Sequence, residues 1–286
     1  MAVQILTDST SYIDKNIREK LKINIVSLSV NFEDESFREV DIDNETFYKK
    51  MKSKGIPKSS QPSISEIYNV MRRVVEKGQS LLCVFISSNM SGTFSTAHVA
   101  KDMIIEEFKD AEIEIVDSRS NCMQLGYAAI VAAKAALEGK SLSEVKMIAE
   151  DNIKKSRFLF IPDTLEYLKK GGRIGGASAL IGNLLKIIPI LTVENGETTM
   201  ITKVRTKQKA MVTMVDKMLQ DIKELGLGEI SVHHIDCYDE AKIIANDLMQ
   251  KLNIEVGICD IGPVIGLHVG PGTVGLAYYT KNKRGI

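Results

Sequence analysis

Short apolar segments alternate with amphipathic helical patterns along the first half of the chain, and this rhythm restricts the fold more than any other feature. The segment Leu81–Ser87 is apolar almost throughout, as expected of a strand that is covered on both faces. Further strand-like segments are Val3–Thr7, Ile23–Val30 and Ile113–Val116, and helical patterns separate them. This order predicts an α/β fold in which helices flank a parallel sheet.

Local signals place the starts of several helices. The turn Asp8–Thr10 is expected to cap a helix that carries Ile13, Ile17 and Leu21 on one face. Ser63 begins an S-x-x-E capping box, so a helix should start there. The apolar residues that this second helix is expected to bury are Ile64, Ile67, Met71 and Val74.

The pattern changes after a predicted helix at Leu142–Lys155, and we expect two domains, residues 1–157 and 158–286. The second, smaller α/β domain should hold helices at Lys207–Leu225 and Asp239–Leu252. The segment Ile174–Ile190 is apolar on nearly all sides and is predicted to be a buried helix. The predicted strands of this half are Phe158–Ile161, Ile188–Val193, Thr199–Val204, Glu229–Ile235 and Val274–Thr280.

Composition excludes several classes of function. Lys+Arg and Asp+Glu both number 37, so the chain lacks the basic excess of a nucleic-acid-binding protein. The four cysteines are far apart and form no CxxC pair, which favours free thiols in a reducing compartment. No segment has the roughly 18 apolar residues of a membrane span, and the N-terminus does not resemble a signal peptide. We therefore expect a cytoplasmic protein.

Common catalytic motifs are also missing. Gly270–Gly275 matches G-x-G-x-x-G, but an apolar strand follows it where a nucleotide site needs a helix, so we expect no nucleotide cofactor. The four histidines lack metal-site spacing, and no metal is expected. G-x-S-x-G is absent, although Ser91, His268 and Asp8 could still form a triad in space.

Hydroxyl-rich turns recur where a predicted strand gives way to a helix. They are Thr7–Thr10, Ser59–Ser63 and Ser87–Ser95. In a parallel sheet such turns gather at the carboxyl ends of the strands, where ligands of open α/β folds bind. Free backbone N–H groups at helix starts would favour an anion there. Simple helix capping explains each turn equally well, so the residues alone name no ligand.

Six short motifs occur in order across both predicted domains. They are Thr7-Asp8-Ser9-Thr10, Ser59-Ser60-Gln61-Pro62, Ser91-Gly92-Thr93, Lys170-Gly171-Gly172-Arg173-Ile174, Val204-Arg205-Thr206 and Gly266-Leu267-His268-Val269-Gly270. Together they resemble the DegV family of bacterial fatty-acid-binding proteins, with one family unit spanning residues 3–281.

The resemblance implies a long-chain fatty acid, such as palmitate, stearate or oleate, in a buried tunnel. Its carboxylate would meet the hydroxyls of Ser59 and Ser91. The resemblance also implies a separate fatty acid kinase that phosphorylates the bound acid. Arg173, Arg205 and His268 would then contact the kinase or the phosphate. Transient contact with a membrane is a further expectation, and the protein itself would not be an enzyme. Ser59 departs from the threonine common in the family and lacks the methyl that restricts χ1.

The buried helices at Ile174–Ile190 and Gly126–Leu137 are candidate tunnel walls, with ordinary core as the alternative for most of their residues. Two other functions stay open at this level. One is an acyl hydrolase or acyltransferase that uses Ser91 and His268, and the other is a regulatory protein that senses lipid. The sequence shows no DNA-reading element, which argues against direct transcriptional control.

Overall fold

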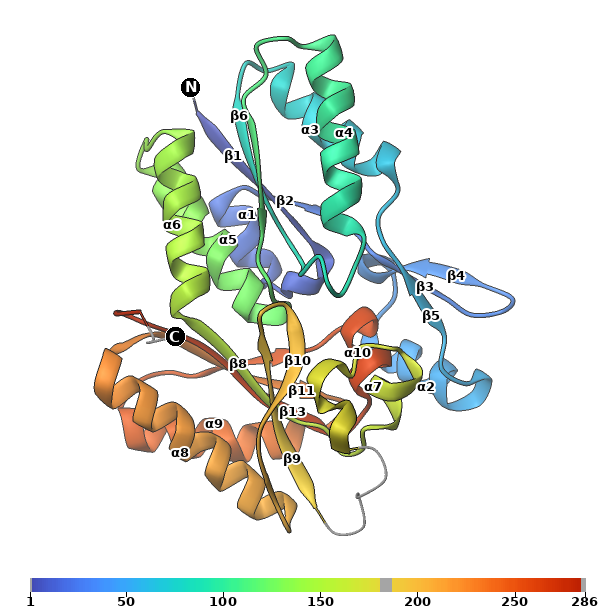
Figure 1. Cartoon of the computed structure of the whole chain (residues 1–286), viewed down its shortest axis with the longest axis vertical. Coiled ribbons are helices and arrows are strands. Elements are labelled where there is room, and N and C mark those ends of the chain that lie inside the picture. Colours follow the sequence, from blue (N-terminus) through green and yellow to red (C-terminus); the bar gives the residue numbers. More distant parts are fainter. Residues whose placement is uncertain (1, 181–186, 284–286) are drawn as a thin grey trace.

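A computed structural model describes residues 2–180 and 187–283 of the 286-residue chain. Its first sheet has four strands, all parallel, in the order β2-β1-β6-β7 (Figure 1). This is the sheet that the β-α-β-α rhythm predicts. Its strands are β1 (Val3–Asp8), β2 (Ile23–Val26), β6 (Ser80–Phe85) and β7 (Ile113–Asp117).

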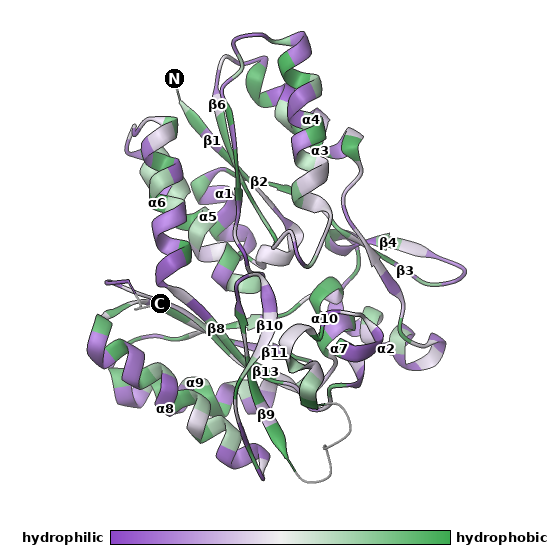
Figure 2. Ribbon diagram, viewed as in Figure 1, coloured by the Kyte–Doolittle hydropathy of each residue, from purple (hydrophilic) through white to green (hydrophobic). Residues whose placement is uncertain are grey.

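Helices cover both faces of this sheet. The pair α3 (Ile64–Val75) and α4 (Thr93–Glu107) packs on one face, and α5 (Cys122–Leu137) and α6 (Leu142–Lys155) pack on the other. Successive residues of β6 therefore enter different cores, and all six are buried. Figure 2 shows hydrophobic colouring over much of β1 and β6, although β1 also contains the hydrophilic residues Gln4 and Asp8. The expectation for a strand covered on both faces is confirmed.

The second sheet has six strands in the order β10-β9-β8-β13-β11-β12. Only the β11–β12 pair is parallel. Two long helices, α8 (Lys207–Leu225) and α9 (Tyr238–Leu252), pack against it, and α5 lies between it and the first sheet. The strands are β8 (Ser156–Ile161), β9 (Ile188–Glu194), β10 (Glu197–Val204), β11 (Leu227–Ile235), β12 (Gly257–Asp260) and β13 (Thr273–Thr280).

A third, small sheet brings the two halves of the chain together. Its strands are β4 (Ser36–Arg38), β3 (Ser29–Asn31) and β5 (Lys58–Ser60), in that order. The short helix α10 (Pro263–Val269) packs against β3 and β5, and it also contacts α2 (Asn44–Lys54) and α7 (Glu166–Lys170). Residues about 200 positions apart in the sequence thus become neighbours.

Three local predictions are wrong. Ile23–Val30 is not one strand, because β2 and β3 belong to different sheets. The first helix, α1 (Lys15–Leu21), is capped by Asp14 instead of the turn at Asp8–Thr10, which forms the 3-10 turn Ser9–Ser11. Ile64 is 43% exposed, because it is the first residue of α3 and lies outside the core-facing stripe.

The helix predicted at Ile174–Ile190 is also wrong. The described part of this segment begins with a 3-10 turn, Gly175–Leu180, and β9 starts at Ile188; residues 181–186 lie outside the described part. Gly175 has a φ of +48°, and a Cβ there would lie 2.6 Å from the backbone oxygen of Thr198. The backbone at Gly175 therefore lies directly against β10 with a positive φ. A regular right-handed helix cannot continue through such a position.

The predicted α/β class is confirmed. The division into residues 1–157 and 158–286 stays a prediction, and it falls inside β8. None of the helices within residues 2–180 and 187–283 has the length and apolar character needed to cross a bilayer.

Candidate ligand cavity

A cavity of about 300 Å³ lies where the first sheet, the small sheet and the second sheet meet. This volume is at the lower end of the range typical of small-molecule sites. Most of its wall is apolar. The apolar wall includes Leu28, Ile86, Phe158, Phe160, Val264 and Ile265.

A polar cluster occupies part of the cavity wall. Four residues named from the sequence, Ser59, Ser91, Arg173 and His268, all line the cavity. They come from β5, the turn before α4, the turn after α7, and α10. Arg205 does not join them. It lies exposed just after β10, about 20 Å along the strand from Thr198, which does line the cavity.

His268 and Ser59 are in direct contact, with 2.8 Å between the imidazole Nε2 and the hydroxyl Oγ. Burial, together with the nearby charge of Arg173, lowers the pKa of His268 to about 4, so the ring is neutral near pH 7. A neutral ring with its proton on Nε2 would donate to Ser59 Oγ. The Ser59 hydroxyl hydrogen would then be free to donate to a ligand.

Ser91 belongs to the turn that starts α4. Its Oγ lies 2.9 Å from Thr93 Oγ1 and accepts a hydrogen bond from the Thr93 N–H at 3.3 Å. This contact stabilises the turn before α4, but it is not the helix cap, because the N-cap residue is Gly92 and no side chain caps this helix start. Because Ser91 also lines the cavity, the same hydroxyl is placed beside any bound molecule.

The rest of the Ser59-Ser60-Gln61-Pro62 motif holds the two serine-bearing segments together. Gln61 Nε2 donates to Thr96 Oγ1 in α4, and its side chain lies over Gly92. A Cβ on Gly92 would fall 1.9 Å from Gln61 Oε1. A glycine at this position thus allows β5 to approach the start of α4 closely.

Arg173 links two turns beside the cavity. Its Nε and Nη2 donate to the backbone oxygen of Met90, both at 3.2 Å, and its Nη1 donates to the oxygen of Gly171 at 2.7 Å. The guanidinium therefore ties the turn that holds Ser91 to the turn after α7. A positive charge beside the two serines also favours an anionic ligand.

The proposed triad is not assembled. The Asp8 carboxylate accepts hydrogen bonds from the N–H groups of Thr10 and Ile86, at 3.0 and 2.7 Å, and from the Thr10 hydroxyl. Burial raises the pKa of this carboxyl to about 6. His268 contacts Ser59 and not Ser91, and its Nδ1 has no hydrogen-bond partner among the described residues. Within residues 2–180 and 187–283, no carboxylate orients the imidazole as a triad requires.

Sequence reasoning missed most of the apolar wall. Phe158 and Phe160 are two residues apart in β8, so both project from the same face, and their rings stack with centroids 5.2 Å apart. The spacing of two residues between these phenylalanines is the sequence signal that could have indicated this part of the apolar wall. The helix α10 was not predicted at all, and Gly126–Leu137 of α5 contributes no residue to the lining. No group of three or more metal-ligating side chains occurs within the described ranges.

Comparison with known proteins agrees with this architecture. Residues 2–281 match the family described as "Uncharacterised protein, DegV family". A DegV domain-containing protein of Clostridium acetobutylicum is 66% identical over 285 residues, covering 99% of this chain and 100% of the relative.

Two solved structures are similar over almost the whole chain. One is DegV, a fatty acid binding protein from Bacillus subtilis, with a TM-score of 0.89, 32% identity, and coverage of 98% of this chain and 100% of that one. The other is a stearic acid-binding protein from Eubacterium ventriosum, with a TM-score of 0.88, 26% identity, and coverage of 98% of both chains. The chain described here belongs to the DegV family.

Proposed function

We propose that this protein binds a long-chain fatty acid, such as palmitate, stearate or oleate, without converting it. The observation that carries the proposal is a single cavity that joins an apolar wall to a cluster of Ser59, Ser91, His268 and Arg173. An acyl chain fits the wall, and a carboxylate fits the cluster. The fatty acids named for two structurally similar proteins support the same ligand class.

The head group would be held by charge-assisted hydrogen bonds. Both serine hydroxyls can donate to a carboxylate, with His268 supporting Ser59 from behind. In this proposal residues 1–157 supply the two serines of the carboxylate site. Residues 158–286 supply His268, Arg173 and much of the acyl-chain wall, including Phe158 and Phe160. No acid in the described part of the chain orients His268, which favours binding over hydrolysis.

We further propose that a separate fatty acid kinase receives the bound acid. Arg205 is exposed and free to meet a partner, whereas three of the five N–H donors of Arg173 are engaged by Met90 and Gly171. An Arg205→Ala variant that retains fatty acid, but whose bound acid is no longer phosphorylated by the kinase, would support this division.

Native mass spectrometry tests the fatty-acid proposal directly. The mass of gently purified protein should exceed that of the bare chain by the mass of one fatty acid. Protein stripped of this ligand should take up added palmitate. An empty chain that takes up neither palmitate nor oleate would remove the proposal. Turnover of an acyl ester that is lost in His268→Ala would favour the hydrolase instead.

Replacing either serine should weaken binding without unfolding the protein. Ser59→Ala and Ser91→Ala each remove one hydrogen bond to a charged group, worth about 1.5 kcal/mol, so we expect about a tenfold rise in the Kd for palmitate. Isothermal titration measures it. Ser53→Ala, at an exposed serine of α2, is the matched control and should leave the Kd unchanged. An unchanged Kd in Ser91→Ala would exclude that hydroxyl from the site.

Gly171→Ala should disturb the head-group site through His268. A Cβ at Gly171 would lie 2.2 Å from His268 Nδ1, so the ring must move away and lose its contact with Ser59. We expect a loss of about tenfold in palmitate affinity, equivalent to one charge-assisted hydrogen bond. Gly257→Ala, where a Cβ meets open space, is the control. Equal affinity in both variants would show that His268 does not support the carboxylate.

A further inference from the structure

The helix α10 forms a large part of the ligand cavity although it is only seven residues long. Val264, Ile265, His268 and Val269 all line the cavity. Val264 and His268 are four residues apart and so lie on the same side of the helix. The position of this short helix therefore decides both the shape of the apolar wall and the contact between His268 and Ser59.

The start of α10 is held by a side chain from a distant part of the chain. Glu39 Oε1 accepts a hydrogen bond from the Val264 N–H at 2.8 Å. Tyr12 Oη donates to the same oxygen at 2.8 Å and accepts from the Ile265 N–H at 3.2 Å. The N-cap residue, Gly262, has no side chain that could cap the helix. Glu39 and Tyr12 therefore supply the hydrogen-bond partners for the first two N–H groups of α10, those of Val264 and Ile265.

Glu39 is well placed to act as a fixed anchor. It lies in the 3-10 turn Glu39–Asp41 and is only 6% exposed, and its other oxygen accepts from the Ser9 hydroxyl. Burial raises the pKa of this carboxyl to about 7, although the hydrogen bonds from Ser9, Val264 and Tyr12 act in the opposite direction. Water has little access to the carboxyl, so its contacts with the protein fix its orientation.

The backbone at the start of α10 is also fitted closely to this anchor. A Cβ on Gly262 would lie 2.7 Å from the Tyr12 ring and 2.9 Å from Glu39 Oε1. Glu39 itself is not among the residues that line the cavity. Any effect of Glu39 on a ligand must therefore be indirect. It can pass through α10, or through Leu28, which lines the cavity and whose backbone oxygen accepts from the Glu39 N–H at 2.8 Å.

We propose that Glu39 is a positioning residue of the head-group site, which anchors the start of α10 and thereby holds His268 against Ser59. Val264 and His268 are about 6 Å apart along the helix axis, so a tilt at the anchored end moves the imidazole at the other end. The inference rests on the proposed function for its ligand, but the placement of His268 is measurable without one.

The test compares Glu39→Ala with Glu39→Gln in the full chain. Alanine removes the anchor. Glutamine keeps an oxygen for the Val264 N–H and an amide for Ser9. We expect Glu39→Ala to weaken palmitate binding about tenfold and to shift the ring resonances of His268 in unliganded protein, as seen by NMR. Glutamine should restore both to near the wild-type values. A His268→Gln variant assigns the ring resonances.

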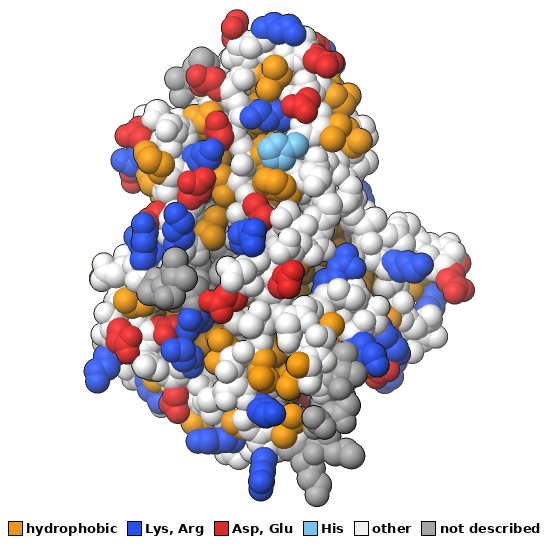
Figure 3. Space-filling model, in the orientation of Figure 1, with side chains coloured by type: hydrophobic (Ala, Val, Ile, Leu, Met, Phe, Trp, Pro, Cys, Tyr) orange, Lys and Arg blue, Asp and Glu red, His pale blue; other side chains and the backbone are white. Residues whose placement is uncertain are grey.

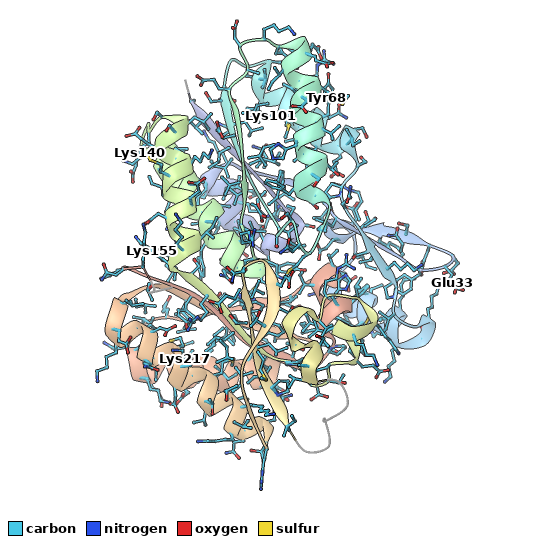
Figure 4. The ribbon with its side chains drawn as sticks, viewed as in Figure 1. Glu33, Tyr68, Lys101, Lys140, Lys155 and Lys217 are labelled. Carbon is cyan, nitrogen blue, oxygen red and sulfur yellow. The ribbon has the colours of Figure 1, made fainter. Side chains whose placement is uncertain are left out.

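Controls separate anchoring from a general loss of fold. Glu33 lies at the far end of the β3–β4 hairpin (Figure 4), and Glu33→Gln should change neither quantity. If Glu39→Ala does not fold, Tyr12→Phe removes one of the two links to α10, and a loss of about threefold is expected.

Wild-type affinity and unchanged ring resonances in Glu39→Ala, or in Tyr12→Phe where alanine does not fold, would overturn the inference. So would a folded Glu39→Gln variant that loses as much affinity as alanine. Failure of wild-type protein to bind palmitate would instead remove the proposed function, while the ring resonances would still test the anchor.

Discussion

Palmitate is expected to bind roughly a thousandfold more tightly than decanoate. The two acids share a head group and differ by six methylenes, each worth about 0.8 kcal/mol when it leaves water. The difference of about 5 kcal/mol corresponds to a little more than three powers of ten in Kd. The apolar wall that includes Phe158, Phe160 and Ile265 would supply this energy. Hydroxyl contacts would mainly decide which end of the ligand lies at Ser59 and Ser91.

Titrations with decanoate, dodecanoate, tetradecanoate and palmitate, all below their aggregation limits, measure this slope. A constant gain of about fourfold per methylene is the expected result. Affinity that stops rising before palmitate would give the length at which the cavity is full. Equal Kd values for all four acids would mean that the head group dominates binding, which contradicts the proposed role of the apolar wall.

Asp221→Ala is expected to lower the free energy of unfolding by about 3 kcal/mol, because it leaves a largely buried charge without its partner. Asp221 lies on α8 and accepts from Arg157 in β8 at 2.6 Å and from the Tyr278 hydroxyl in β13 at 2.7 Å. Lys217, labelled on the same helix in Figure 4, lies 3.1 Å from its other oxygen. The Arg157 side chain is only 14% exposed. This group therefore joins α8 to the second sheet.

Urea denaturation followed by circular dichroism measures the change. Asp216→Ala is the matched control, since Asp216 is an exposed aspartate on the same helix, and it should change stability by less than about 0.5 kcal/mol. A loss below about 1 kcal/mol for Asp221→Ala would show that Lys217 and solvent already compensate Arg157.

The distribution of surface charge indicates less about the function than the cavity does. Acidic and basic side chains are interspersed over the face shown in Figure 3, in keeping with equal numbers of Lys+Arg and Asp+Glu. The balanced composition therefore gives no charge-based reason to expect nucleic acid as a partner.

The parallel sheet was predictable because its signal is local. Each strand is a short apolar run and each helix repeats its apolar residues with helical spacing, so Leu81–Ser87 and Leu142–Lys155 could be assigned from neighbouring residues alone. The predictions failed where distant segments decide the structure. The turn at Gly175–Leu180 follows from contact with β10, and the separation of β2 from β3 follows from pairing with β4 and β5.

The candidate site shows the same contrast. The hydroxyl-rich turns after strands indicated only a possible anion site, and the family resemblance singled out Ser59 and Ser91 as well as Arg173, Arg205 and His268. Their roles toward a carboxylate or a kinase remain predictions. Nothing in the order of residues showed that His268 would reach Ser59, or that Arg173 would be engaged by Met90 and Gly171 while Arg205 stayed exposed.

The α/β class and most of the helices and strands can be read from the order of residues, because backbone preference and hydrophobic spacing act over a few residues. The cavity, by contrast, exists only through tertiary contacts. Its polar cluster depends on α10 packing against β5, and the helix start is held by Glu39, 225 residues away from Val264. Such contacts follow from the packing of the whole chain. The distance between Glu39 and Val264 depends on how all the elements between them fold, and the residues next to either one in the sequence do not reveal it.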